Sequence, residues 1–276
     1  MGMTDEERFR FDLAGFFVRP AILTSDEIGE IVDQIDRIHH NPESLPPAHR
    51  VAPGGPASLL IDHPKVIDVL REIIAPGDNI RLESCKSVWR EKGESAGAFH
   101  GGGPQQTNPI FGYRVQGEKI YAGMVRVIFE LTDVRKGDGG TCFIAGSHKA
   151  NFPMHPDHTS WEEGKRSDFF VSYECPAGSA LFFTENVCHA GPEWKRDTPR
   201  VAILHAYAHL ATHWHRLTTP PEVLASLSRE KQAFFREPWM ADFVTLPAKK
   251  NTIERFVSSG EAPISTEWVT RAKRNK

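Results

Sequence analysis

The chain has 276 residues, of which 39% are hydrophobic and 25% charged, and its formal net charge is −3. This length and composition are ordinary for a globular protein that buries a substantial core. The charge gives no reason to expect binding to a nucleic-acid polymer or to a membrane surface. No apolar run approaches the ~18–20 residues that span a bilayer.

The N-terminal segment and the cysteines indicate a cytoplasmic protein. Residues 1–7 lack the basic and then apolar order of a signal peptide. The four cysteines show no CxxC spacing, and without an export signal we expect them to be reduced thiols. They are Cys85, Cys142, Cys175 and Cys188.

The first quarter of the chain predicts one strand and two helices. Phe16–Val18 has the composition of a short strand. Thr24–Glu27 is a capping box, which predicts the start of a helix whose apolar residues recur at helical spacing as far as Ile38. Residues 41–58 are rich in Pro, Gly and Ala and predict a loop. Pro64 predicts the start of a second helix, which Pro76 and Gly77 end.

From residue 79 to about 210 the pattern changes to short apolar runs separated by turn residues. The predicted strands are Ile80–Arg90, Tyr121–Leu131, Thr141–Ala145, Phe169–Cys175, Ala180–Phe183 and Val201–Ala208. Many short strands of this kind favour a sandwich, jelly roll or barrel. Pro220–Arg236 predicts a terminal helix, and the basic residues 271–276 are expected to fray. We see no repeat and no linker, and we therefore expect residues 1–276 to form one domain.

Four sequence features in a fixed order carry the chemistry. They are His100-Gly101-Gly102, Gly146-Ser147-His148-Lys149, His189, and Arg200 eleven residues after His189. Each alone has an ordinary interpretation, because a histidine beside glycines is usually a turn residue and an arginine after a turn is usually a surface charge. In this order they resemble the phytanoyl-CoA hydroxylase-like iron(II)/2-oxoglutarate oxygenases, over about residues 10–215.

The resemblance implies a mainly β fold, a double-stranded β-helix (jelly-roll, cupin-like) barrel with flanking α-helices. It also implies that His100 and His189 bind Fe(II), that Arg200 anchors 2-oxoglutarate, and that O2 is consumed. Imidazole suits iron, and a guanidinium suits a carboxylate because it can form two parallel charge-assisted bonds. We interpret His148 as a residue that structures its loop and not as a ligand.

The chain departs from the family at Gly102, where the family has an aspartate two residues after the first histidine. Three explanations are open. The related iron halogenases carry Gly or Ala here, and chloride fills the position that the carboxylate leaves. Alternatively, the enzyme is inactive, or a carboxylate from elsewhere, such as Glu94 or Glu185, completes an ordinary triad.

A second departure is Gly191, where relatives often carry a hydroxyl residue that touches 2-oxoglutarate. Lys86 and Arg126 lie on predicted strands at positions that face the barrel interior in the family. A buried charge needs a partner, so they either form internal ion pairs, for instance with Glu83 or Glu130, or meet ligands. We assign Lys86 to the cosubstrate and Arg126 to an anionic substrate.

The function predicted from the sequence is therefore an Fe(II)/2-oxoglutarate-dependent halogenase that chlorinates an unactivated carbon of a small, possibly nucleotide-like substrate. The first alternative is a hydroxylase of the same family with a relocated carboxylate ligand. The second, from another class, is a non-catalytic barrel that binds a small molecule. Nothing in the sequence indicates an oligomeric state.

Overall fold

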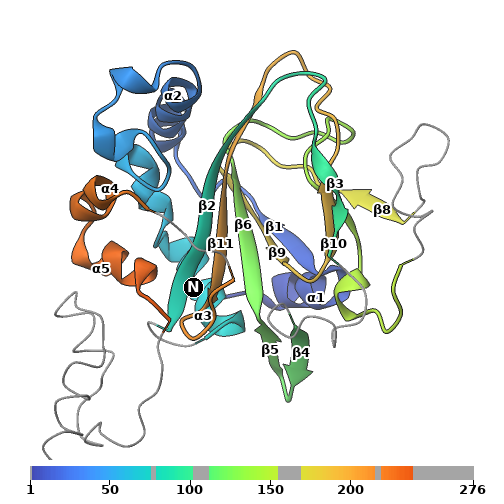
Figure 1. The fold of residues 1–276 in the computed structure, drawn as a ribbon. Coiled ribbons are helices and arrows are strands. Elements are labelled where there is room, and N and C mark those ends of the chain that lie inside the picture. Colours follow the sequence, from blue (N-terminus) through green and yellow to red (C-terminus); the bar gives the residue numbers. More distant parts are fainter. Residues whose placement is uncertain (1, 76–78, 102–111, 155–168, 215–218, 239–276) are drawn as a thin grey trace, which may run out of the picture.

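A computed structural model describes residues 2–75, 79–101, 112–154, 169–214 and 219–238 (Figure 1). Its helices are α1 (Asp5–Ala14), α2 (Ser25–His40), α3 (Pro64–Ile73), α4 (Pro221–Ser226) and α5 (Arg229–Gln232), with short 3-10 turns between them. Its strands are β1 (Phe16–Arg19), β2 (Ile80–Arg90), β3 (Ala96–His100), β4 (Tyr113–Gln116), β5 (Lys119–Ala122), β6 (Met124–Glu130), β7 (Cys142–Ile144), β8 (Phe170–Ser172), β9 (Ser179–Thr184), β10 (Cys188–Gly191) and β11 (Arg200–His209).

The strands form two antiparallel sheets and a hairpin. The larger sheet has the order β1-β9-β6-β11-β2, the smaller has the order β3-β10-β7-β8, and β4 pairs with β5. Neighbours in space are distant in sequence, as where β6 lies between β9 and β11. In these two pairings, residues 49 to 84 positions apart in the sequence lie side by side.

The two faces of the larger sheet serve different purposes because side chains alternate along a strand. One face carries Phe182, Val127 and Ile203, and it packs in the same apolar cluster as residues of α2 and α3. Figure 1 shows α2, α4 and α5 on this side of the sheet. The other face carries Leu181 and Ile128, which share a second cluster with Phe143 of β7. We call this second face the inner face.

Most predicted elements are confirmed, and the differences have local causes. The capping box of Thr24 and Glu27 begins α2, and Pro64 begins α3. The predicted strand 121–131 is divided between β5 and β6, and the predicted terminal helix is divided into α4, α5 and a 3-10 turn. Helix α1 was missed although Thr4 and Glu7 form a capping box, because it buries little besides Phe11 and so lacks an apolar stripe.

The expected fold is confirmed in part. The antiparallel sheets facing each other are present, but in the described ranges no hydrogen-bonded strand pair joins the two sheets into a closed barrel. The helices before β2 and after β11 make the structure mixed α and β and not mainly β. Among the described helices, none combines the length and the apolar character needed to cross a membrane.

Candidate metal centre

The pairing of β3 with β10 places two histidines opposite each other. His100 and His189 are direct partners in the antiparallel register, and their ring centroids are 4.1 Å apart. His189 is also the partner of Phe143 on the other side, so it lies in the middle of the smaller sheet. Two residues 89 positions apart in the sequence therefore present imidazoles to the same point.

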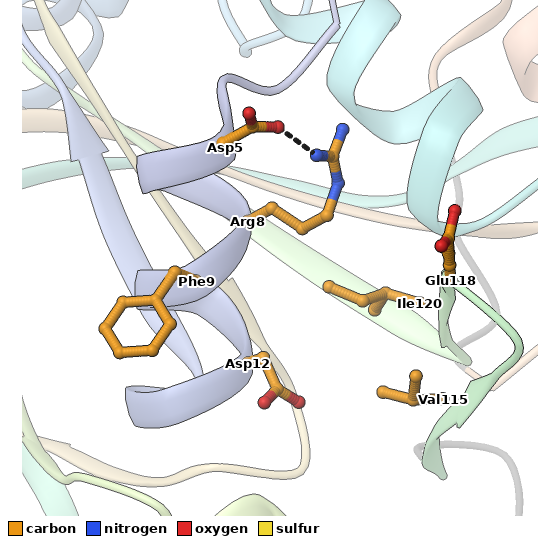
Figure 2. Close-up of a pocket in the computed structure, with 7 residues that line it drawn as sticks. All are labelled: Asp5, Arg8, Phe9, Asp12, Val115, Glu118 and Ile120. Atoms are coloured by element: carbon orange, nitrogen blue, oxygen red, sulfur yellow. Dashed lines mark hydrogen bonds and ion pairs between the residues drawn. The ribbon is translucent and has the colours of Figure 1, made fainter.

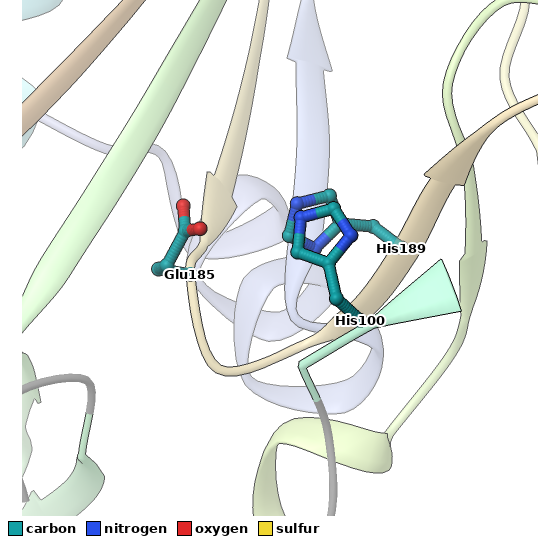
Figure 3. A group of neighbouring side chains, drawn as sticks. All are labelled: His100, Glu185 and His189. Carbon is teal, nitrogen blue, oxygen red and sulfur yellow. The ribbon is translucent and has the colours of Figure 1, made fainter. Parts of the chain in front are cut away.

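A carboxylate completes this group. Glu185 lies in the turn between β9 and β10, and one ligand atom from each of His100, Glu185 and His189 lies within 4.8 Å of the others. Figure 3 shows the Glu185 carboxylate facing the two rings. Two imidazole nitrogens and one carboxylate oxygen are a donor set that suits Fe(II) and leaves coordination positions open. The donors present therefore fit an iron ion.

The structure distinguishes the two carboxylates proposed as replacements for the missing aspartate. Glu94 is exposed, and its carboxylate accepts a hydrogen bond of 2.8 Å from the backbone N–H of Glu91. Of these two residues, Glu185 is the one grouped with His100 and His189. Gly102 lies outside the described residues.

A glycine allows the Glu185 turn to approach β3. Gly101 has φ +75°, and a Cβ on it would lie 2.8 Å from the carbonyl oxygen of Val187 and 3.1 Å from that of Glu185. Both the backbone conformation and the close contact favour glycine here. The residue after the first histidine is thus in contact with the turn that carries the carboxylate.

Gly101→Ala should therefore weaken metal binding by roughly 10–100-fold, the effect typical of losing a group that orients a ligand. Gly97→Ala is the matched control, because Gly97, on the strand β3 that precedes Gly101, has φ +82° but a Cβ there would meet no atom within 4 Å. Calorimetric titration with Mn²⁺ compares the two variants. Equal losses would mean that backbone strain, and not the contact with the turn, is responsible.

Arg126 fixes the ionisation state and the orientation of Glu185. Its Nε lies 2.5 Å from Oε2 of Glu185 and its Nη2 lies 3.3 Å from Oε1. Burial alone would raise the pKa of Glu185, but the Arg126 guanidinium beside it holds this pKa below its ordinary value. The carboxylate is thus an anion at neutral pH, as a metal ligand must be.

His189 is held as a neutral ring with one nitrogen available. Burial lowers the pKa of His189 to about 4, although the nearby Glu185 opposes this shift. Nδ1 lies 2.8 Å from the carbonyl oxygen of Val187, to which it can only donate. This leaves Nε2 with its lone pair, the arrangement usual for a metal-binding histidine. The ring of Phe183 covers it, with centroids 4.7 Å apart.

Arg200 is not a surface charge. It is 3% exposed and forms a bidentate ion pair with Glu130, which is fully buried. Its Nη2 also donates to the hydroxyl oxygens of Tyr173 at 3.2 Å and Thr141 at 3.4 Å. Burial by itself would lower the pKa of Arg200, but Glu130 and Tyr173 together raise it above its ordinary value.

The other predicted residues are placed as follows. Arg126 pairs with Glu185 and not with the suggested Glu83 or Glu130, while Glu83 pairs with Arg81 at 2.7 Å. Lys86 is exposed and lies opposite Leu204 of β11. Its assignment to the cosubstrate stays a prediction.

His148 lies outside the metal group, as expected. It is buried, and its Nε2 lies 3.1 Å from the carbonyl oxygen of Asp12. This contact ties the 3-10 turn Ser147–Lys149 to the end of α1. The residue therefore has a structural contact that accounts for its burial.

A surface hollow of about 510 Å³ lies between α1 and the β4–β5 hairpin (Figure 2). Its lining residues are Asp5, Arg8, Phe9, Asp12, Val115, Glu118 and Ile120. None of them belongs to the group of His100, Glu185 and His189. The hollow is therefore separate from the candidate metal centre.

Comparison with known families decides the class of protein. The sequence model of the phytanoyl-CoA dioxygenase (PhyH) family matches residues 11–202. This range is more than half of the chain and contains His100, Glu185, His189 and Arg200. The chain belongs to the phytanoyl-CoA dioxygenase family. It is accordingly an Fe(II)/2-oxoglutarate-dependent dioxygenase, an oxidoreductase. A search of curated protein sequences found no match.

Several solved structures share the fold. HygX from Streptomyces hygroscopicus with iron bound has 20% identity and a TM-score of 0.65, over 81% of this chain and 94% of its own. The α-ketoglutarate-dependent epimerase SnoN from nogalamycin biosynthesis has 16% identity and a TM-score of 0.52, over 75% of this chain and 83% of its own. The non-heme monooxygenase ThoJ, as its nickel complex, has 19% identity and a TM-score of 0.51, over 73% and 76%.

These likenesses concern the fold and leave the finer predictions open. At such identities they show the shared fold of facing antiparallel sheets. None of the three is described as a halogenase. The family match ends at residue 202, so the single domain over residues 1–276 stays a prediction, as does the cytoplasmic location.

Proposed function

We propose that this dioxygenase is a hydroxylase in which Glu185 replaces the aspartate that the family carries two residues after the first histidine. The observation that supports this most is the grouping of His100, Glu185 and His189 within 4.8 Å. In this proposal the three side chains hold Fe(II). When bound, the iron, with 2-oxoglutarate and O2, supplies the oxidising power needed to attack an unactivated C–H bond.

The residues of the chain orient and protect this centre. Val187 fixes the tautomer of His189 through its carbonyl oxygen, and Arg126 holds the Glu185 carboxylate through two N–H groups. The ring of Phe183 lies against His189 and keeps water from that side. Such outer contacts set the direction and basicity of the ligands.

The substrate that we propose is a small molecule. The relatives support this, since HygX has been seen with hygromycin B and SnoN with nogalamycin RO. Lys86 and Arg126 were the two basic residues that favoured an anionic, nucleotide-like substrate in the sequence, but the guanidinium of Arg126 is bound to Glu185 in the structure. Arg126 therefore no longer supports the prediction that the substrate is anionic.

A halogenase is the second candidate, and one observation favours it. Both oxygens of Glu185 are within hydrogen-bonding distance of Arg126. If that ion pair holds the carboxylate away from the metal in the loaded enzyme, the centre lacks a protein carboxylate. Gly102 offers no side chain in its place. Chloride would then be the anion that completes the centre.

Product mass separates the two candidates. The full chain would be incubated with Fe(II), 2-oxoglutarate, O2 and candidate small molecules, in chloride, in bromide and in a halide-free buffer. We expect addition of one oxygen atom in all three, with succinate released in equal amount. A chlorinated product in chloride and a brominated product in bromide would overturn the hydroxylase proposal in favour of the halogenase.

A further inference from the structure

A second arginine, Arg90, lies at the inner-face position beside Arg200. The two residues are direct partners in the pairing of β2 with β11. Arg90 is 3% exposed, and its Nη1 donates to the carbonyl oxygen of Pro192 at 2.9 Å. Its Nε and Nη2 are buried and have no hydrogen-bond partner in the part of the chain that the structure describes. Leaving a buried N–H group without an acceptor costs free energy, so these two N–H groups favour the binding of a ligand that accepts hydrogen bonds.

The two unpartnered atoms have the geometry that a carboxylate needs. Nε–H and Nη2–H form one edge of the planar guanidinium and point in parallel, which is the arrangement for bidentate binding of a carboxylate. Arg200 uses the same edge, Nε and Nη2, for the carboxylate of Glu130. The equivalent edge is thus occupied in Arg200 and open in Arg90.

The charges point to an anionic ligand. Glu130 forms its ion pair with Arg200, and among the described residues no carboxylate accepts a hydrogen bond from Nε or Nη2 of Arg90. Burial, followed by the repulsion of Arg200, lowers the pKa of Arg90 to about 10. The guanidinium is therefore still charged at neutral pH. The pair of arginines with one glutamate leaves an excess of one positive charge.

The position of Arg90 relative to the metal centre fits the cosubstrate. An ideal Cβ on Gly191 would lie 3.1 Å from Nη1 of Arg90, so the guanidinium occupies the space that a side chain at 191 would need. Gly191 lies two residues after His189 on β10, roughly 7 Å along the strand. A five-carbon dicarboxylate can bridge such a distance when its keto-acid end is at the metal.

We propose that Arg90 receives the distal carboxylate of 2-oxoglutarate on its Nε/Nη2 edge, next to the balanced Arg200–Glu130 pair. Arg90 then replaces the hydroxyl side chain that relatives often carry at the position of Gly191. The inference rests on the proposed metal centre, because that centre fixes the other end of the cosubstrate.

Binding calorimetry on the full chain loaded with Mn²⁺ tests this without turnover. The two ligands are 2-oxoglutarate and 2-oxopentanoate, which has the same carbon chain but no distal carboxylate. Arg90→Gln should weaken binding of 2-oxoglutarate at least ~30-fold and change that of 2-oxopentanoate by no more than about 2-fold. Lys92→Gln, which removes an exposed cation two residues further on, should change neither.

Two results would overturn the proposal: equal weakening of both ligands by Arg90→Gln, which indicates a structural role, or no weakening of either. If Arg90→Gln does not fold, Arg90→Lys is measured instead. It keeps the charge but loses the planar edge, so it should weaken 2-oxoglutarate alone, by about 3–10-fold; equal weakening of both ligands would again overturn the proposal. Failure of the original chain to bind Mn²⁺ would instead overturn the metal centre, and this inference with it.

Discussion

His189→Ala should abolish both metal binding and 2-oxoglutarate turnover while the protein stays folded. His189 lies in the middle of the smaller sheet, and its neutral ring presents Nε2 towards His100 and Glu185. Because losing an outer contact of a metal ligand already costs ~10–100-fold, removing the ligand itself should lower metal affinity at least ~100-fold. Mn²⁺ titration and succinate release, with circular dichroism for the fold, provide the measurement.

His213→Ala is the control for this variant, because His213 is exposed and lies outside the group of His100, Glu185 and His189. It should bind Mn²⁺ and release succinate as the original chain does. A folded His189→Ala protein with full succinate production would show that another residue coordinates the metal. The proposed centre would then be wrong.

Glu185→Ala should also lower metal affinity at least ~100-fold, and adding Gly102→Asp should restore at least ~10-fold of that loss. The first change removes the carboxylate grouped with His100 and His189. The second introduces a carboxylate where the family normally carries it. A rescue of this kind is expected only if the two positions serve the same coordination site. Mn²⁺ titration of the single and double variants measures it.

Glu94→Ala is the matched control, since Glu94 is the other carboxylate considered from the sequence and its side chain is bonded to the backbone of Glu91. It should leave metal affinity unchanged.

Unchanged affinity in Glu185→Ala, together with chlorine in the product, would mean that chloride, and not a carboxylate, occupies the third position on the metal. The function would then be the halogenase that Gly102 first indicated.

The sequence by itself determined the class of chemistry and most of the elements. The order of His100, His189 and Arg200 indicated an iron and 2-oxoglutarate enzyme through its resemblance to a known family. Helix starts at Thr24 and Pro64 were also predictable, since capping depends on residues within three or four positions.

Contacts between distant strands were decided only by the tertiary structure. The approach of Glu185 to His100 depends on the register of β3 with β10 and on the space at Gly101. Arg126 of β6 pairs with Glu185, which lies 59 residues later in the turn after β9. Arg200 of β11 pairs with Glu130 of β6, which lies 70 residues earlier. No local pattern encodes such pairings, because a carboxylate looks the same in the sequence whether it meets a metal, an arginine or water. For the same reason the open edge of Arg90 beside Gly191 became visible only once β2, β10 and β11 were packed together.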